Sequence, residues 1–209
     1  MKRFDLALKR GLDLLLSTCA VVVLSPLLLL IALAVKCDST GPVLYRGVRM
    51  GAGGRRFPML KFRTMVIGAD EIGGPSTADG DPRITRLGRY LRKYKLDELP
   101  QLLNVMNGDM SVVGPRPEVP QYVALFTEEE RQILTVRPGL TDLATLWNAD
   151  EGRRLAGAAD PERVYLEAIK PKKVQLQLQY LRHRSLATDL WIIWRTILLV
   201  VLRRRPALS

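Results

Sequence analysis

The sequence predicts a mostly helical α+β domain that is attached to one face of a membrane. Three observations support this fold class: a long uncharged segment containing a proline near the N-terminus, two short segments of β character around a glycine cluster, and amphipathic helical patterns over most of the remainder. At 209 residues the chain suits one domain, and nothing in it repeats. We therefore expect a single domain over residues 1–209, with a membrane element at 1–40.

The composition points to an anionic partner. A formal net charge of +11 favours nucleic acid, an acidic membrane surface or a phosphorylated substrate, and charge alone does not choose among them. The only titratable metal-binding side chains besides carboxylates are Cys19, Cys37 and His183. Their number and separation argue against a zinc site or a disulfide framework and favour a reducing compartment.

The uncharged segment covers residues 14–35, which as a straight helix would cross roughly the ~30 Å hydrocarbon core of a bilayer. It lacks a small-residue cleavage site before a polar region, so a retained segment is a better interpretation than a signal peptide. Ser25-Pro26 lies in its middle, where the proline cannot donate to the carbonyl of Val22, and we expect a kink there.

Basic residues flank this segment on both sides, which the positive-inside rule would keep in the cytoplasm. They are Lys2, Arg3, Lys9 and Arg10 before it and Lys36, Arg46, Arg49, Arg55, Arg56 and Lys61 after it. We interpret residues 1–40 as a re-entrant helix-break-helix that enters and leaves by the same face. A single-spanning helix is the alternative.

Two strands are expected next, at residues 43–46 and 57–65, with a hairpin turn at Gly51–Gly54. The glycine cluster lacks a following Lys-Ser/Thr and a helix, so a phosphate-binding loop is disfavoured. Lys61 and Arg63 are two residues apart and would leave the same face of the second strand. That face could bind an anion, and a solvated basic edge strand is the alternative.

Helical patterns fill the rest of the chain. A basic amphipathic helix is expected from Arg83 to about Lys95, either solvated or lying on anionic headgroups. Further helices are expected from near Asp97, over 118–131 with a capping box at Thr127 and Glu130, and over 161–169 and 172–184 after an Asp160 N-cap. The apolar run 190–202, followed by Arg203, Arg204 and Arg205, is too short to span and suits an interfacial or a buried helix.

Asp97 and Glu98 are the candidate catalytic residues. An acidic pair at a helix start commonly only caps it, but here a basic helix precedes the pair, and Lys61, Arg63 and Arg116 lie on separate elements. If these groups converge, a carboxylate could act as a nucleophile or metal ligand. With no histidine or thiolate nearby, Mg²⁺ is favoured over zinc, and the combination suggests phosphoryl transfer.

Several motifs, in one order over nearly the whole chain, resemble the bacterial sugar transferase family, the monotopic phosphoglycosyl transferases. They are residues 61–65 (KFRTM), 81–85 (DPRIT), 88–92 (GRYLR), 96–102 (LDELPQL), 104–111 (NVMNGDMS), 113–117 (VGPRP) and 137–141 (RPGLT). Ser25 and Pro26 match the family's helix-breaking pair. The chain resembles the small form, without the extra transmembrane helices of larger relatives.

The resemblance implies a re-entrant membrane helix, interfacial helices and a catalytic part at 41–209 on the cytoplasmic face of the bacterial inner membrane. It implies that Asp97 attacks the β-phosphate of a UDP-sugar and releases UMP. The phosphosugar bound to Asp97 then passes to undecaprenyl phosphate in a ping-pong reaction, the first membrane step of exopolysaccharide, O-antigen or glycoprotein glycan synthesis. A covalent intermediate lets a soluble donor and a membrane-bound acceptor use one site in turn.

The resemblance also implies residue roles. Glu98 would hold Mg²⁺ with Asp97 or manage protons. Substrate-binding roles fall on Lys61, Arg63, Pro115, Arg116, Pro117 and Arg137. The implied partners are a UDP-sugar, undecaprenyl phosphate and the lipid bilayer, without nucleic acid, and the interfacial helices could support a homodimer.

Two features keep alternatives open. After the Pro-Gly turn the family often has Thr-Gly followed by Ala-Gln-Val-Asn-Gly, whereas here Thr141-Asp142-Leu143 stands instead. Asp142 could be structural, catalytic or sugar-selecting, and the donor sugar stays open. A non-catalytic basic membrane adaptor would explain the charge but not the Asp-Glu pair, and a multi-spanning sugar-phosphate transferase would need more than one hydrophobic segment.

Overall fold

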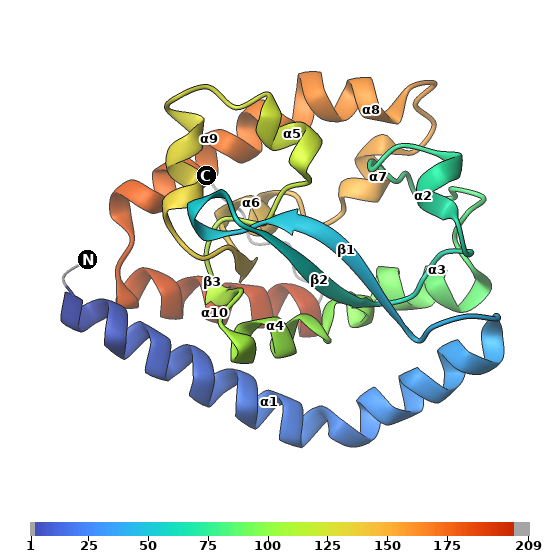
Figure 1. The fold of residues 1–209 in the computed structure, drawn as a ribbon, viewed down its shortest axis with the longest axis horizontal. Coiled ribbons are helices and arrows are strands. Elements are labelled where there is room, and N and C mark those ends of the chain that lie inside the picture. Colours follow the sequence, from blue (N-terminus) through green and yellow to red (C-terminus); the bar gives the residue numbers. More distant parts are fainter. Residues whose placement is uncertain (1–2, 203–209) are drawn as a thin grey trace.

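The computed structural model describes residues 3–202 of the chain, and it is mostly helical with two small sheets. A long helix, α1, runs along one side of the molecule, and the remaining elements form a body beside it (Figure 1). The helices are α1 (Arg3–Asp38), α2 (Ala69–Ile72), α3 (Arg86–Lys93), α4 (Gln101–Asn107), α5 (Pro120–Ala124), α6 (Leu143–Trp147), α7 (Glu151–Leu155), α8 (Pro161–Val164), α9 (Lys170–His183) and α10 (Leu186–Leu202). The strands are β1 (Leu44–Met50), β2 (Arg56–Phe62), β3 (Ser111–Val113) and β4 (Gly139–Thr141).

Helix α1 is continuous over 36 residues, with Pro26 inside it. The break expected at Ser25-Pro26 is wrong, because α1 continues through Pro26. The expected kink agrees with the bend that Figure 1 shows in the middle part of the helix. The Ser25 hydroxyl donates to the carbonyl of Val22 at 2.8 Å, the group that Pro26 leaves without its usual N–H donor. This side-chain bond explains why the helix can continue through the proline.

By length and composition, the part of α1 from Asp5 to Asp38 is the one helix among the described residues that could cross a membrane. Its most apolar 18-residue stretch has a mean hydropathy of 2.7, and 11% of that stretch is buried against the rest of the protein. Leu and Val side chains along it are therefore exposed. A core helix of a soluble domain would instead be mostly covered.

The predicted hairpin is confirmed. Strands β1 and β2 pair antiparallel, with Tyr45 opposite Lys61 and Arg49 opposite Phe57. A 3₁₀ turn at Ala52–Gly54 joins them, and Gly53 and Gly54 have φ values of 66° and 71°, in the left-handed region that glycine adopts without strain. The glycine cluster is thus a turn.

A second pairing was not predicted from the sequence. Strands β3 and β4 are parallel and match Ser111 to Gly139 and Val113 to Thr141. Gly114 follows β3 directly and lies against Gly139 of β4. A Cβ on Gly139 would lie 2.1 Å from the backbone nitrogen of Gly114, so only glycine permits this approach. The contact fixes the start of the Gly114–Pro117 loop.

Two expected helices have different limits. The single helix over 118–131 is wrong: α5 ends at Ala124, and a 3₁₀ segment, Glu130–Thr135, follows. The capping box is confirmed, because the Thr127 backbone nitrogen donates to Glu130 at 2.8 Å, and it starts this second segment. Helix α3 begins at Arg86 and not at Arg83, since Thr85 caps it by accepting from the Gly88 nitrogen.

The C-terminal helices follow the expected order. Asp160 accepts from the Arg163 nitrogen at 3.0 Å, as expected for an N-cap. The two helices expected over 161–169 and 172–184 form one path, in which α8 passes through a π-helical segment, Tyr165–Ile169, into α9. Helix α10 packs its buried Ile192 against Val113, Leu146 and Tyr180, so it is partly a core helix. The arginines 203–205 lie outside the described residues.

Both ends of α1 are fixed to the body by polar contacts. Near its start, Lys9 donates to Asp189 of α10 at 2.7 Å, and the buried Asp13 accepts from Ser111 at 2.8 Å and from the Val112 nitrogen at 3.0 Å. At its end, Arg63 donates to the carbonyls of Ser39 and Thr40, each at 2.7 Å. The helix therefore leaves and returns to the same body (Figure 1).

Candidate active site

The acidic pair lies on a sharp reversal of the chain. After α3, Lys95 adopts a left-handed conformation with φ 57°, the only non-glycine residue with positive φ among residues 3–202. A 3₁₀ turn, Leu96–Glu98, follows and leads into α4 through Pro100. This reversal turns Asp97 and Glu98 toward β2. A conformation that a lysine rarely adopts is held here, which is common at functional sites.

Glu98 is the centre of a charge cluster drawn from three elements. Its carboxylate accepts from Lys61 of β2 at 2.8 Å, and from Arg116 of the Gly114–Pro117 loop through two nitrogens, one of them at 3.1 Å. Asp97 lies beside it, with its Oδ2 atom 3.9 Å from the Lys61 ammonium. The sequence suggested a convergence of cations on the acidic pair, and the structure shows it for Lys61 and Arg116.

The pKa values of the two neighbouring carboxylates are shifted in opposite directions. Burial raises the pKa of Asp97, and the nearby Lys61 ammonium only partly offsets this. Burial would also raise the pKa of Glu98, but Arg116 and Lys61 outweigh it and hold that pKa well below its usual range. Burial lowers the pKa of Lys61, against the attraction of Glu98. Glu98 is thus the fixed anion of the cluster, and Asp97 is the more basic carboxylate.

One oxygen of Asp97 has no partner. The residue is 4% exposed, and its Oδ1 atom is buried without a hydrogen bond from any group among the described residues. Leaving a carboxylate oxygen in this condition is costly, and such groups generally have a function. The unpaired oxygen is available to a ligand, a cation or a reacting atom.

The carboxylates line a large open cavity of about 2290 Å³. Its wall includes Lys61, Arg116 and Pro117, together with the hairpin, the 66–77 segment and α6. Elsewhere on the wall, Lys173 lies 2.6 Å from Glu118, and the Tyr165 hydroxyl donates to the same carboxylate at 2.9 Å. This second cluster was not predicted, because Glu118 lies in the loop before α5 and its partners lie far along the chain, in the π-helical segment and α9.

Arg49 is a further cation of the cavity wall, and it was not among the predicted site residues. The hairpin register places it on the same face as Tyr45 and Lys61, because directly paired residues share a face. No ion pair joins Arg49 to a carboxylate within residues 3–202, and burial lowers the pKa of its guanidinium. The alternation of Tyr45, Gly47 and Arg49 opposite the second strand could have indicated it.

Arg63 does not join Lys61. The two-residue spacing predicted one shared cationic face, but β2 ends at Phe62, and the Arg63 guanidinium turns to the end of α1. It donates there to the carbonyls of Val35, Ser39 and Thr40 and to the Ser39 hydroxyl. The prediction of a common face is wrong, and Arg63 holds α1 to the body.

Three other candidates lie at different distances from the carboxylates. Pro117 lines the cavity, whereas the carbonyl of Pro115 accepts from the Gly139 nitrogen at 2.9 Å, beside a separate small pocket. Arg137 is exposed, donates to the Gly108 carbonyl at 2.9 Å and does not line the cavity. Pro117 thus lies on the cavity wall with the acidic pair, whereas Pro115 and Arg137 contact neighbouring backbone.

The site offers Mg²⁺ one free carboxylate oxygen. No group of three or more His, Cys, Asp or Glu side chains that could hold a metal occurs in the part of the chain that the structure describes. Asp97 nevertheless offers an unpaired carboxylate oxygen, whereas Glu98 is engaged by Lys61 and Arg116. Mg²⁺ commonly binds through one or two carboxylates plus substrate phosphates and waters, and this donor set meets that requirement.

Comparison with known proteins agrees with the geometry. The family model described as bacterial sugar transferase matches residues 4–203. A UDP-N-acetylgalactosamine-undecaprenyl-phosphate N-acetylgalactosaminephosphotransferase of Aeromonas hydrophila is 37% identical over 195 residues, which cover 91% of this chain and 43% of that protein. The chain thus spans less than half of that relative.

Two further relatives are matched over more of their length. A UDP-glucose:undecaprenyl-phosphate glucose-1-phosphate transferase of Caulobacter vibrioides is 40% identical over 203 residues, which are 90% of this chain and 68% of that protein. The exopolysaccharide production protein PSS of Rhizobium leguminosarum bv. phaseoli is 40% identical over 200 residues, covering 92% and 94%. The chain therefore belongs to the bacterial sugar transferase family.

Proposed function

We propose that the protein transfers a sugar-1-phosphate from a UDP-sugar to undecaprenyl phosphate and releases UMP. The observation that carries this proposal is the buried Asp97 carboxylate, with one unpaired oxygen, in a cavity wall that also holds Lys61, Arg116 and Arg49. The names of the relatives describe transfers of this kind, and exopolysaccharide production is named for one of them. The Asp-Glu pair is thus more than a helix cap.

The reaction would have two steps that share one site. Asp97 attacks the β-phosphorus of the donor, a bond from this phosphorus to the carboxylate oxygen forms, and the bond to the bridging oxygen breaks, so UMP leaves with that electron pair. A phosphate oxygen of undecaprenyl phosphate then attacks the same phosphorus, and the bond to Asp97 breaks. The carboxylate is regenerated, and sugar and lipid are joined by a diphosphate. This sequence is ping-pong.

The cations of the site would neutralise the donor diphosphate. Arg49 lacks an ion pair within residues 3–202, so an incoming phosphate would be its counter-ion. Glu98 would hold Lys61 and Arg116 in fixed directions, which lowers the reorganisation needed during reaction. Asp97 and the donor phosphates would hold Mg²⁺, which would supply further charge neutralisation.

The attachment to the membrane would be monotopic. Because the Lys9 and Asp13 contacts and the Arg63 contacts fix opposite ends of α1 to one body, a spanning helix would have to break one set of them. The outer side of α1 exposes Val22, Val23 and several leucines, and α10 exposes Trp191 and Trp194. We infer that α1 enters and leaves the cytoplasmic face of the inner membrane, with α10 at the interface.

The test is a nucleotide-release assay in detergent or nanodiscs. A panel of UDP-sugars with undecaprenyl phosphate and Mg²⁺ should yield UMP with one or a few donors, which identifies the sugar. Without acceptor, mass spectrometry should detect a phosphosugar adduct on the peptide containing Asp97. Near-normal turnover by Asp97→Asn would contradict the nucleophile, and no UMP with any donor would favour a membrane adaptor.

A further inference from the structure

The backbone of Arg116 is held on both sides by two side chains that are fully buried. Asp142 Oδ2 accepts from the Arg116 nitrogen at 3.1 Å, and Gln177 Nε2 donates to the Arg116 carbonyl at 3.3 Å. Gln177 Nε2 also donates to Asp142 Oδ2 at 3.1 Å, and both side chains are 0% exposed. Three groups thus close a ring of hydrogen bonds around one residue, and we call this ring the Arg116 clamp.

The clamp links the loop to two helices. The other oxygen of Asp142 caps α6, because it accepts from the Thr145 nitrogen at 2.6 Å and from its hydroxyl at 2.8 Å. Gln177 belongs to α9, which packs against α6. Pro115 and Pro117 have no N–H groups, so the Arg116 N–H is the only backbone donor of these three residues. The clamp uses that donor.

An aspartate suits position 142 for a specific reason. Four donors converge on its carboxylate: the Arg116 nitrogen, Gln177 Nε2, and the nitrogen and hydroxyl of Thr145. Only a carboxylate offers acceptors on both oxygens, whereas an asparagine would turn its amide group toward two donors. A simple N-cap would need one oxygen, so helix capping alone does not account for the second set of bonds.

We propose that Asp142 and Gln177 are positioning residues that set the direction in which Arg116 presents its guanidinium to Glu98 and to the donor phosphate. The proposal rests on the proposed function for the identity of that phosphate. It assigns a role to Asp142, a residue whose role the sequence left open among structural, catalytic and sugar-selecting interpretations. The residue acts through Arg116 and does not itself touch the substrate.

Two variants separate positioning from folding. Asp142→Asn keeps one oxygen for the α6 cap but faces the Arg116 nitrogen with an amide. Gln177→Met is similar in shape. It removes the Nε2 donor to Arg116 and Asp142, and it also removes Gln177 Oε1, which is buried without a hydrogen bond among the described residues, so part of the stability cost is offset and the protein should still fold. Asp160→Asn is the control, since it removes the same charge from another helix cap, that of α8.

Donor use and UDP binding are the measurements. We expect Asp142→Asn and Gln177→Met to raise the KM for the donor and the Kd for UDP by about tenfold, with kcat/KM lowered by roughly 10- to 100-fold. Asp160→Asn should match wild type. In an Arg116→Ala background, Asp142→Asn should cause no further loss of UDP affinity, because the clamp acts only through Arg116.

The outcomes separate the two proposals. If the wild type releases no UMP from any donor, the proposed function fails, while UDP titrations of the variants still test the clamp. If the wild type is active and both variants retain its KM and its UDP affinity, the clamp is overturned. Fully additive losses in the Arg116→Ala background would also overturn it, because the residues would then act independently.

Discussion

At the scale of residues, Asp97 and Glu98 show how one dipeptide can serve two purposes. Glu98 satisfies Lys61 and Arg116, whereas Asp97 keeps a buried oxygen unpaired. A carboxylate with a raised pKa is a stronger nucleophile as long as it stays ionised. The same condition reduces the stability of the folded state, because desolvation disfavours the charge. The site therefore combines a stabilising anion, Glu98, with a destabilising one, Asp97.

Asp97→Asn should abolish UMP release and raise the melting temperature. The pKa of Asp97 is raised in the folded state, so its charged form weakens folding above that pKa, and the penalty disappears as the pH falls through it. At neutral pH the variant should melt roughly 2–4 °C higher than wild type, and the gap should close under acidic conditions. Calorimetry from pH 4 to 8 checks this. A lower melting temperature at neutral pH would contradict it.

Glu98→Gln should have the opposite effect on stability. The pKa of Glu98 is lowered in the folded state, so its contribution is present above the ordinary glutamate pKa and is lost as the pH falls through the folded value. The variant leaves Lys61 and Arg116 without their anion, which should cost about 2 kcal/mol at neutral pH. Chemical denaturation measures it, and equal stability of the two proteins would refute the assignment of Glu98 as the fixed anion.

Arg49→Ala should weaken donor use without unfolding the hairpin. Its guanidinium lines the cavity and forms no direct ion pair within residues 3–202, so its removal breaks no salt bridge there and takes one cation from the diphosphate. We expect kcat/KM for the UDP-sugar to fall by about 10- to 100-fold. Arg55→Ala, on the exposed hairpin turn outside the cavity, is the matched control. Similar kinetics for both variants would show that Arg49 does not contribute to donor binding.

At the scale of elements, the hairpin was predictable and the β3–β4 pair was not. Strands β1 and β2 are each seven residues long and have a glycine turn between them. The strand patterns and the turn signal therefore lie close together in the sequence. Strands β3 and β4 have three residues each and pair across a long separation in sequence. Three residues show no periodicity, and only tertiary structure reveals the pair.

The same contrast applies to the site. Asp97, Glu98, Lys61 and Arg116 could be proposed from their motifs, because each motif is short and contiguous. Arg63 was misplaced because the alternation of a strand was extended past its last residue, Phe62. The Arg116 clamp and the Glu118–Lys173 pair depend on side chains that only the packing of α9 brings to the loop. Sequence spacing contains no signal for such contacts.

Gly139→Ala should separate β3 from β4 and disable the loop that carries Arg116. Its Cβ would lie 2.1 Å and 2.3 Å from the Gly114 backbone nitrogen and oxygen, which cannot move aside like a flexible side chain. We expect a loss of about 1–3 kcal/mol in unfolding free energy and a strong loss of UMP release. Gly11→Ala, which meets nothing within 4 Å in α1, should keep wild-type stability and activity. Wild-type behaviour of Gly139→Ala would show that the two strands can part without consequence.

At the scale of the whole molecule, α1 is both the apolar surface and a support for the body. Its first third contacts α10 and β3 through Lys9 and Asp13, and its end is held by Arg63 next to β2. Ile31 and Val35 pack with Phe62 and Leu91, so the helix also supplies part of the core. Membrane attachment and the geometry of the site are thus linked through one helix.

Both termini should be accessible from the cytoplasm only. A protease-sensitive tag placed before residue 1, and another after residue 209, should be cut in inverted membrane vesicles and protected in right-side-out spheroplasts. For the N-terminal tag, the polar contacts at both ends of α1 provide the physical reason. Cleavage of the N-terminal tag in spheroplasts would establish a single-spanning helix and refute the monotopic topology.

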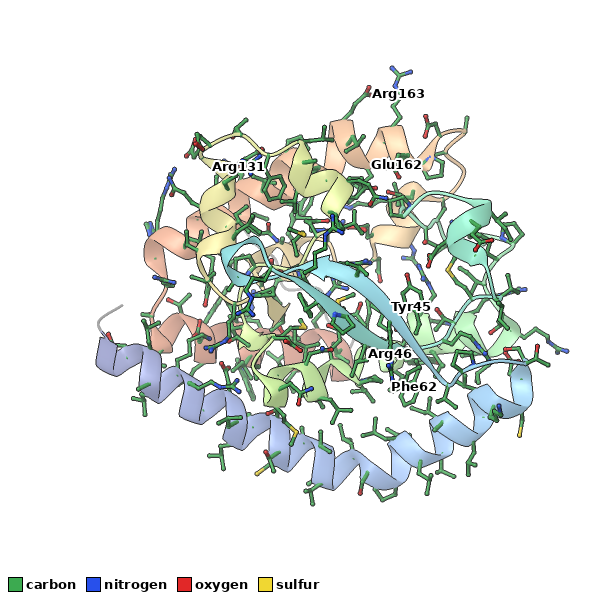
Figure 2. The ribbon with its side chains drawn as sticks, in the orientation of Figure 1. Tyr45, Arg46, Phe62, Arg131, Glu162 and Arg163 are labelled. Carbon is green, nitrogen blue, oxygen red and sulfur yellow. The ribbon has the colours of Figure 1, made fainter. Side chains whose placement is uncertain are left out.

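The bend of α1, visible in Figure 2, has a consequence for the lipid as well as for the protein. A bent helix fixed at both ends would occupy a single leaflet, and each copy would add area to that leaflet without adding any to the opposite one. Such an object acts as a wedge, and the affinity of interfacial helices depends on curvature and lipid composition. The protein should therefore concentrate where the leaflet that holds α1 is stretched or loosely packed.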